Sequence, residues 1–232
     1  VIENGNYVNI LWSDSEKMIK YSTEFLQKNL IKKDTTHLKY SLWKSKDIND
    51  QVYLNYNDVV SAGLTINTGS GQVNLQGNVS DLTSLTVTSN TSSQVSGVIS
   101  GDTALVKAGT SRLTTSANNT YTGGTTVNAG TLFGGAASRS NNVFGTGSIS
   151  VASGATLLID RSDDGALTNA LTLNGGTLRG TNGFGQYWDG NITLGAHSTI
   201  KADYNLIIDG VISGSSKNLT KTGNGNLLLR GN

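Results

Sequence analysis

The chain has 232 residues, with 29 Gly, no Pro and no Cys, and only 14% of its residues are charged. Its net charge is +1 and no basic patch stands out, which argues against a protein that binds nucleic acid through the phosphate backbone. No apolar run reaches the roughly 18 residues of a membrane-spanning helix. The hydrophobic content of 36% allows only a thin core.

Charge and glycine divide the chain near residue 60. Residues 1–60 hold 8 Lys and 8 Asp or Glu but only one glycine, Gly5, and the other 28 Gly lie in residues 61–232. Such a change in composition marks a boundary between two architectures. We therefore expect a small α+β region over 1–60 and an all-β region over 61–232.

The N-terminal region begins with a helix signal. Ser13 and Glu16 form a capping box, since each side chain can bond a backbone group left free at the start of a helix. Apolar residues then recur at helical spacing, which predicts a helix over about 14–32. Apolar and polar residues alternate around Tyr40 and around Leu54, which predicts two strands. The region either caps the first coil of the second region or ends a larger upstream domain, and both alternatives remain open.

The second region is a series of short strands separated by Gly, Asn and Ser. Four segments align with one another: TTVNAGTL from residue 125, ISVASGATL from 149, LTLNGGTL from 171 and ITLGAHSTI from 192. Their apolar residues form two columns, Val127-Val151-Leu173-Leu194 and Leu132-Leu157-Leu178-Ile200. A coil of about 22 residues with two or three short strands is typical of a parallel β-helix. A β-sandwich also has many short strands, but it would not keep these columns in register.

One longer stretch occurs twice. Residues 97–113 read GVISGDTALVKAGTSRL, and residues 210–227 read GVISGSSKNLTKTGNGNL. The two copies lie about 113 residues apart, with one extra residue in the second. A repeat at this scale among short alternating strands indicates a solenoid rather than a compact globule.

The segment LVKAGTSRLTTSANNTYTGGTTVNAGTL, residues 105–132, resembles the passenger-associated repeat of bacterial autotransporters. The positions that fit are Leu105, Lys107, Gly109, Leu113, Asn119, Tyr121, Gly123, Thr125, Val127, Gly130 and Leu132. Two places depart from the pattern: Ser111 stands where glycine is usual, and Ser116-Ala117 stands where a Ser-Gly pair is usual. The second copy stops at Asn232 where its Tyr-containing half should begin, so we expect 61–232 to be a passenger segment truncated in mid-repeat.

The resemblance implies a fold, a location and partners. The fold would be a right-handed parallel β-helix, carried by a segment secreted or displayed on the surface of a Gram-negative bacterium. Export would run through the periplasm and the outer membrane, with the protein's own outer-membrane β-barrel as partner. The lack of Cys fits this route, because a premature disulfide would block passage of an unfolded chain. From the pattern itself, Tyr121 is expected on a neighbouring coil with its hydroxyl at the surface.

Groups that could carry catalysis are few. The two histidines, His37 and His197, lie in predicted loops, and no nucleophile motif is present. The Lys221-Thr222-Gly223 match to a penicillin-binding motif falls inside the repeat, which makes it a chance match. Two sets of carboxylates could form a calcium site or a hydrolytic pair, but their spacing favours isolated surface residues: Asp160, Asp163 and Asp164, and Asp189, Asp203 and Asp209. We predict no catalytic residue, no cofactor and no metal site.

The loop TNGFGQYWDG, residues 181–190, concentrates aromatic side chains in a chain with 6% aromatics. Phe184, Tyr187 and Trp188 are therefore a candidate ligand-contact loop, where exposed rings would stack on sugars or anchor a protein. The alternative is that the rings fold back and cover apolar surface.

The sequence favours a non-catalytic passenger segment that acts in adhesion, in self-association or as a stalk. Its partner would be a host surface protein or glycan, or a second copy of the chain, and no nucleic acid. The alternative is the stalk of an autotransporter enzyme, a protease or esterase, whose catalytic domain lies upstream. Whether the whole protein is an enzyme stays open.

Overall fold

The computed structural model describes residues 2–4, 7–10, 39–42, 51–54, 63–80, 82–136, 142–161, 165–181 and 185–231. The helix expected over 14–32 lies outside these ranges, as do His37, Asp163, Asp164 and Phe184. All regular elements in the described ranges are strands. Within the same ranges, no helix is long and apolar enough to cross a membrane.

The strands form three sheets, which are the three sides of a coil. The first sheet has eleven strands: β1 (Ile2–Asn4), β2 (Tyr7–Ile10), β3 (Lys39–Leu42), β5 (Gly63–Gly69), β7 (Ser84–Ser89), β9 (Ala104–Ala108), β11 (Thr125–Val127), β13 (Ile149–Ala152), β16 (Leu171–Asn174), β19 (Ile192–Leu194) and β22 (Ile212–Ser213). The second has nine: β4 (Gln51–Leu54), β6 (Gln72–Leu75), β8 (Ser93–Val95), β10 (Arg112–Thr115), β12 (Thr131–Ala136), β14 (Thr156–Arg161), β17 (Thr177–Gly180), β20 (Ser198–Ala202) and β23 (Leu219–Thr222). The third has four: β15 (Ala166–Leu167), β18 (Gln186–Trp188), β21 (Leu206–Ile208) and β24 (Leu227–Leu229).

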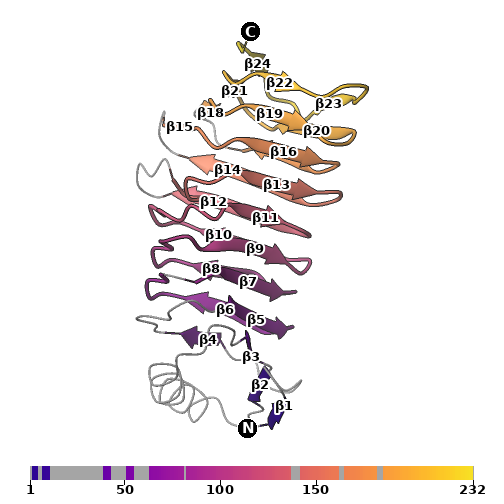
Figure 1. The fold of residues 1–232 in the computed structure, drawn as a ribbon. Helices are drawn as coiled ribbons and strands as arrows, with labels where there is room; N and C mark the ends of the chain where they lie inside the picture. The colour runs from indigo at the N-terminus through magenta and orange to yellow at the C-terminus, as the bar shows by residue number, and fades with distance from the viewer. Residues whose placement is uncertain are drawn as a thin grey trace.

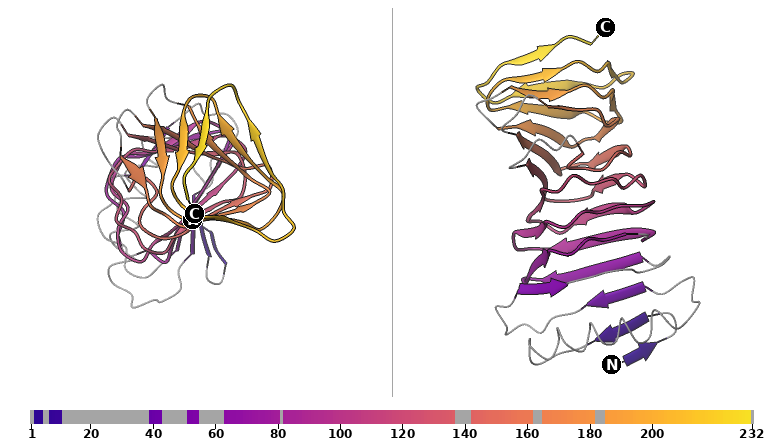
Figure 2. Two further views of the ribbon diagram at one scale, coloured as in Figure 1. Left: turned by 90° about the horizontal axis from the view of Figure 1, so that it is seen from above. Right: turned by 90° about the vertical axis from the view of Figure 1, so that its left-hand side faces the viewer.

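Successive coils stack along one axis, with the two chain ends at opposite ends of a rod (Figure 1 and Figure 2). Neighbouring strands within each sheet run parallel, apart from the antiparallel pair β1 and β2. Parallel pairing between coils places equivalent residues about 4.8 Å apart along the rod. The fold is therefore the expected parallel β-helix.

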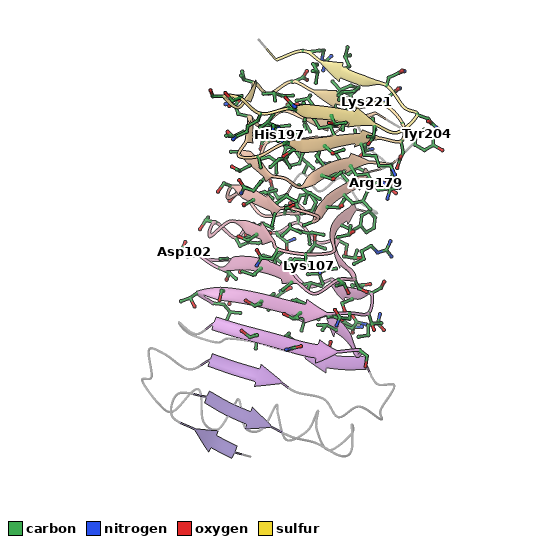
Figure 3. All side chains as sticks on the ribbon, turned by 90° about the vertical axis from the view of Figure 1, so that its right-hand side faces the viewer. Asp102, Lys107, Arg179, His197, Tyr204 and Lys221 are labelled. Carbon is green, nitrogen blue, oxygen red and sulfur yellow. The ribbon has the colours of Figure 1, made fainter. Side chains whose placement is uncertain are left out.

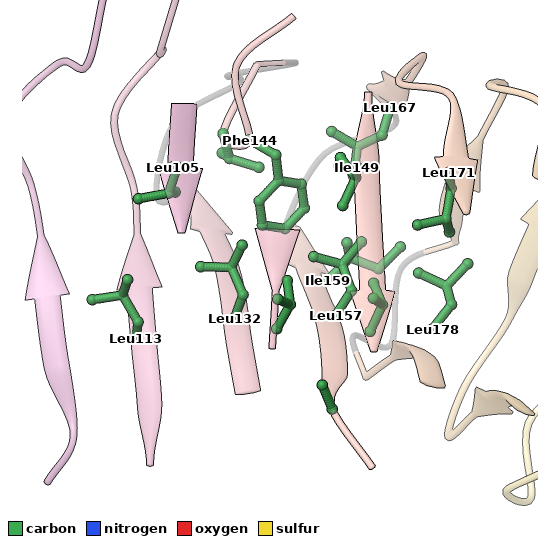
Figure 4. Packing of buried hydrophobic residues seen from close by; sticks show 14 of the residues in the cluster. Leu105, Leu113, Leu132, Phe144, Ile149, Leu157, Ile159, Leu167, Leu171 and Leu178 are labelled. Atoms are coloured by element: carbon green, nitrogen blue, oxygen red, sulfur yellow. The ribbon is translucent and has the colours of Figure 1, made fainter. Parts of the chain in front are cut away.

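Two columns of stacked apolar side chains, each predicted from the sequence, fill the interior. The first sheet pairs Val127 with Val151, then Leu173, then Leu194. The second sheet pairs Leu132 with Leu157, then Leu178, then Ile200. All eight side chains are buried. Figure 4 shows such residues facing one another between the sheets, so each coil contributes a thin layer to one continuous core.

The two strands expected near Tyr40 and Leu54 are present as β3 and β4. β3 pairs in parallel with β5, and β4 pairs in parallel with β6. The described strands before residue 60 thus continue the first and second sheets. The division into a region over 1–60 and a region over 61–232 stays a prediction.

The two copies of the repeat occupy different sides of the coil. In the first copy, β9 belongs to the first sheet and β10 to the second. In the second copy, the matching strands β23 and β24 belong to the second and third sheets. The second copy thus begins one side of the coil further round than the first. This agrees with the offset, since about 113 residues are about five and a third coils of about 21 residues.

One corner of the coil brings successive backbones unusually close. A Cβ added to Gly190 would lie 1.9 Å from the carbonyl oxygen of Asn169 in the preceding coil. The same addition to Gly210 would lie 1.9 Å from the carbonyl oxygen of Gly190. Only glycine allows this approach, so the corner is fixed by residue size rather than by a particular φ angle.

Candidate functional site

Lys107 of the repeat points into the rod. It occupies the inward column of the first sheet between Val87 and Val127, and its exposed fraction is 1%. Its Nζ donates to the carbonyl oxygens of Ala108 at 2.7 Å, Gly109 at 2.8 Å and Ala129 at 3.2 Å. Loss of hydration on burial lowers the pKa of Lys107 from 10.5 to about 8. The lysine therefore bonds its own corner to the corner of the next coil.

Asn119 of the repeat connects three coils. Its Oδ1 accepts the backbone N–H of Ile99 in the preceding coil at 2.8 Å. Its Nδ2 donates to the carbonyl oxygens of Val143, in the following coil, at 2.8 Å and of Ala117 at 3.2 Å. The side chain is buried, so its amide satisfies backbone groups that the third side of the coil leaves without sheet partners.

Tyr121 corrects one expectation, because its hydroxyl is buried and not at the surface. The side chain has no exposed area, and Oη lies 2.6 Å from Oγ1 of Thr125. The Thr125 hydroxyl in turn donates to the carbonyl oxygen of Phe144 at 3.2 Å. Alternation along the strand places Thr125 inward, where its hydroxyl can bond that of Tyr121. This pattern in the sequence could have predicted that the tyrosine hydroxyl is buried.

Among the other described residues considered for chemistry, Asp189 and Asp209 follow the paired residues Trp188 and Ile208, so they lie in equivalent positions of neighbouring coils. His197 lies exposed in a bend, as expected, where its Nδ1 accepts the backbone N–H of Asn218 at 2.9 Å. Asp203 is bonded by Arg179 at 2.7 Å, and Asp209 is paired with Arg230, so these carboxylates serve as ion-pair partners. The described residues contain no group of three or more His, Cys, Asp or Glu that could hold a metal ion.

The outer face of the first sheet from β5 to β22 carries no charge. Its eight strands contain one charged residue, Lys107, which points inward. The outward side chains are small, and their central column contains seven hydroxyls and one valine: Thr65, Thr86, Val106, Thr126, Ser150, Thr172, Thr193 and Ser213. We call this surface the neutral face.

The second side of the coil differs from the neutral face in charge. The outer face of the second sheet presents Arg112, Arg179 and Lys201, and Arg112 lies 5.1 Å from the centre of the Phe133 ring. Figure 3 shows Arg179 on the side opposite to Asp102. On the third side, Asp189 and Asp209 follow β18 and β21. The four short strands of the third sheet contain no charged residue themselves, so among the described strands the first sheet is distinguished by the length of its outer face without charge.

Known proteins are similar to this chain both in the repeat and over most of its length. The family model named Passenger-associated-transport-repeat matches residues 105–132. The chain is also 33% identical over 193 residues, 83% of its length, to the protein named Adhesin BmaC autotransporter from Brucella suis biovar 1 (strain 1330). The chain is an autotransporter passenger segment. No solved structure matches it.

The passenger segment spans 5% of the length of this relative. The relation implies export to the surface of a Gram-negative bacterium, and it implies an outer-membrane barrel as partner during secretion.

The aromatic loop of the passenger segment is divided between core and surface. Trp188 has no exposed area and belongs to the core, and its Nε1 has no hydrogen-bond partner among the described residues. Tyr187 is half-buried on the outer face of the third sheet, where it pairs with Ala166 and Ile207. The ligand-contact prediction therefore stays with Tyr187 and Phe184, while Trp188 covers apolar surface.

Proposed function

We propose that this passenger segment acts in adhesion and has no catalytic activity of its own. The observation that supports the proposal is the neutral face, a long, charge-free surface of hydroxyls, amides and small apolar groups. Its partner would be a host surface protein or glycan, or the same face of a second copy. The proposed route to the surface is secretion through the periplasm and across the outer membrane, aided by the protein's own barrel.

The size of the neutral face predicts weak contacts that act together. Eight strands about 4.8 Å apart, with an outer face roughly 15 Å wide, cover about 550 Å². An interface of about 1,100 Å² between two such faces lies at the low end for specific complexes. Many copies on one cell would raise the overall strength of attachment without any new contact.

A second copy suits the geometry of the neutral face. Both copies carry the same spacing of about 4.8 Å, so columns match along their whole length. A face without charge also removes the repulsion between like charges that identical surfaces would otherwise meet. Self-association is therefore the form of adhesion that we propose to test first.

Adhesion is preferred over the stalk of an enzyme because the relative is named an adhesin. The absence of catalysis in the described part of the rod has separate support, since its buried polar groups bond neighbouring coils. Such groups stabilise the rod and are not placed to meet a substrate.

Two threonines in the same coil give a matched test. Thr172 lies on the neutral face and Thr177 lies on the outer face of the second sheet, and both are half-buried. We expect Thr172→Asp to reduce clustering of beads coated with the chain at least fivefold and Thr177→Asp to change it less than twofold. Bead clustering is measured by light scattering, and binding to host cells by flow cytometry. If Thr172→Asp keeps both bead clustering and binding to host cells, or if the two variants lose them equally, the neutral face is not the adhesive surface.

The aromatic loop provides a second, smaller contact to test. We propose that Tyr187 and Phe184 contact a glycan or protein, and Tyr187→Ala should weaken binding to host cells without lowering the melting temperature by more than a degree or two. Trp188→Ala is the comparison, since removal of a buried ring should destabilise the rod. Unchanged binding by Tyr187→Ala would assign this loop to packing.

A further inference from the structure

The corners that follow β9 and β11, in two successive coils, direct three backbone carbonyls to one ammonium group. The carbonyl oxygens of Ala108, Gly109 and Ala129 lie 2.7, 2.8 and 3.2 Å from Nζ of Lys107. An ammonium group has three N–H donors and no acceptor, so each of the three donors has an acceptor here. The site is closed, since Lys107 is 1% exposed.

We infer that this pair of corners, where Ala108, Gly109 and Ala129 direct their carbonyl oxygens to one point, is a binding site for an alkylammonium ion. In the native chain the ligand is the side chain of Lys107 itself. The three oxygens are the carbonyl cage.

Backbone shape, and not the lysine, builds the carbonyl cage. Gly109 has a φ of +79°, in the left-handed region that favours glycine, and it turns the chain between β9 and β10. Gly130 does the same in the next coil with a φ of +65°. A Cβ added at Gly109 would lie 2.4 Å from the carbonyl oxygen of Ser89, so the preceding coil also holds the corner in place.

The second copy of the repeat repeats the contact on another side of the rod. Lys221 donates from Nζ to the carbonyl oxygen of Gly223 at 2.6 Å, as Lys107 does to Gly109. Gly223 has a φ of +80°. Lys221 lies in the second sheet, where it pairs with Ile200, whereas Lys107 lies in the first. The Lys-x-Gly sequence therefore produces the contact independently of the side on which it lies.

The inference does not depend on adhesion, and it predicts chemical rescue. In Lys107→Ala the alanine keeps Cβ, and the missing atoms are three carbons and one nitrogen, the composition of propylammonium. A ligand that binds only the folded state raises the melting temperature with its concentration. At neutral pH, we expect propylammonium at about ten times its dissociation constant, roughly a few hundred millimolar, to raise the melting temperature of Lys107→Ala by a few degrees.

Two controls separate the carbonyl cage from a general cavity. Val127→Ala opens space in the same inward column one coil further along, so propylammonium should leave its melting temperature unchanged. Propanol, which has the same length but no charge and one donor, should not rescue Lys107→Ala. Equal rescue by propanol, or of Val127→Ala, would overturn the inference.

A measurement on the unaltered chain keeps the inference testable if Lys107→Ala does not fold. In a sample with ¹⁵N at lysine Nζ, the ammonium protons of Lys107 should exchange with water roughly tenfold more slowly than those of Lys201. The side chain of Lys201 is 40% exposed, so it serves as the reference. Equal exchange rates would show that the ammonium is not held in a closed site.

Discussion

The hydroxyl of Tyr121 lies 2.6 Å from Oγ1 of Thr125, four residues further along the chain, and both side chains are buried. The threonine passes the hydrogen bond on to the carbonyl oxygen of Phe144. Burial raises the pKa of Tyr121 well above its ordinary 10.0, although the hydrogen bond with Thr125 acts in the opposite direction. The phenol is therefore a neutral part of the core.

Stability should fall in alkaline solution because of Tyr121. Above pH 10 the unfolded chain releases the phenol proton while the folded chain keeps it. The contribution is thus complete below pH 10 and is lost as the pH rises further. Tyr121→Phe should cost about 1 kcal/mol at neutral pH and lose less stability between about pH 10 and 11 than the parent chain. Urea unfolding at both pH values tests this, and parallel curves for the two proteins would contradict it.

Lys107 should make the free energy of unfolding rise with pH, in a range below the one where Tyr121 makes it fall. Its pKa in the folded chain is about 8 against an ordinary 10.5, so the unfolded chain binds more protons between these values. Stability should therefore rise over this window by as much as about 3.5 kcal/mol, at about 1.4 kcal/mol for each pKa unit. Lys107→Met should lack the rise. Urea unfolding at about pH 7.5 and 9.5 compares the two chains below the range in which Tyr121 matters.

Asn119→Ala should be among the most destabilising polar substitutions in the repeat. It removes bonds to Ile99, Ala117 and Val143 and leaves buried backbone groups unpaired. We expect a loss of about 3 kcal/mol in the free energy of unfolding. Asn128→Ala, at an exposed position of the same repeat, should change it by less than about 0.5 kcal/mol. A loss below about 1 kcal/mol for Asn119→Ala would mean that water replaces these bonds.

Gly190→Ala should disturb the stacking of coils. The added Cβ would lie 1.9 Å from the carbonyl oxygen of Asn169, which is backbone and cannot move aside alone. We expect a loss of more than about 3 kcal/mol and a lower yield of folded protein. Gly154→Ala is the comparison, since it has a φ of +76° but no atom within 4 Å, and it should cost about 1 kcal/mol. A reversed order of melting temperatures would refute the assignment of close approach to this corner.

The coil and its core can be predicted from the sequence, because the same alternation of apolar and polar residues recurs at intervals of about one coil. Val127, Val151, Leu173 and Leu194 stack as expected, and both strands near Tyr40 and Leu54 are present. Each of these predictions depends only on which residues share a face. Such information is contained in spacing alone.

The buried polar groups were harder to predict. Alternation places Lys107 inward between Leu105 and the corner, but a lysine in sequence normally indicates a solvated position. Its burial depends on the carbonyl of Ala129, contributed by the next coil. For Trp188, the composition of the loop suggested a contact surface, whereas pairing with Leu167 and Ile208 places the ring in the core. Contacts between coils decide both cases, and no local pattern records them.

The turn of the repeat by one side has a consequence for longer rods of this kind. In one copy β9 and β10 lie in the first and second sheets, whereas in the next copy the matching strands β23 and β24 lie in the second and third. The number of residues between two copies therefore sets the rotation, about the rod axis, of the surfaces formed by all later residues. Removal of a whole coil would leave the orientation of the downstream surfaces about the rod axis unchanged. Removal of a third of a coil would rotate these surfaces by about 120° about that axis and leave the core continuous.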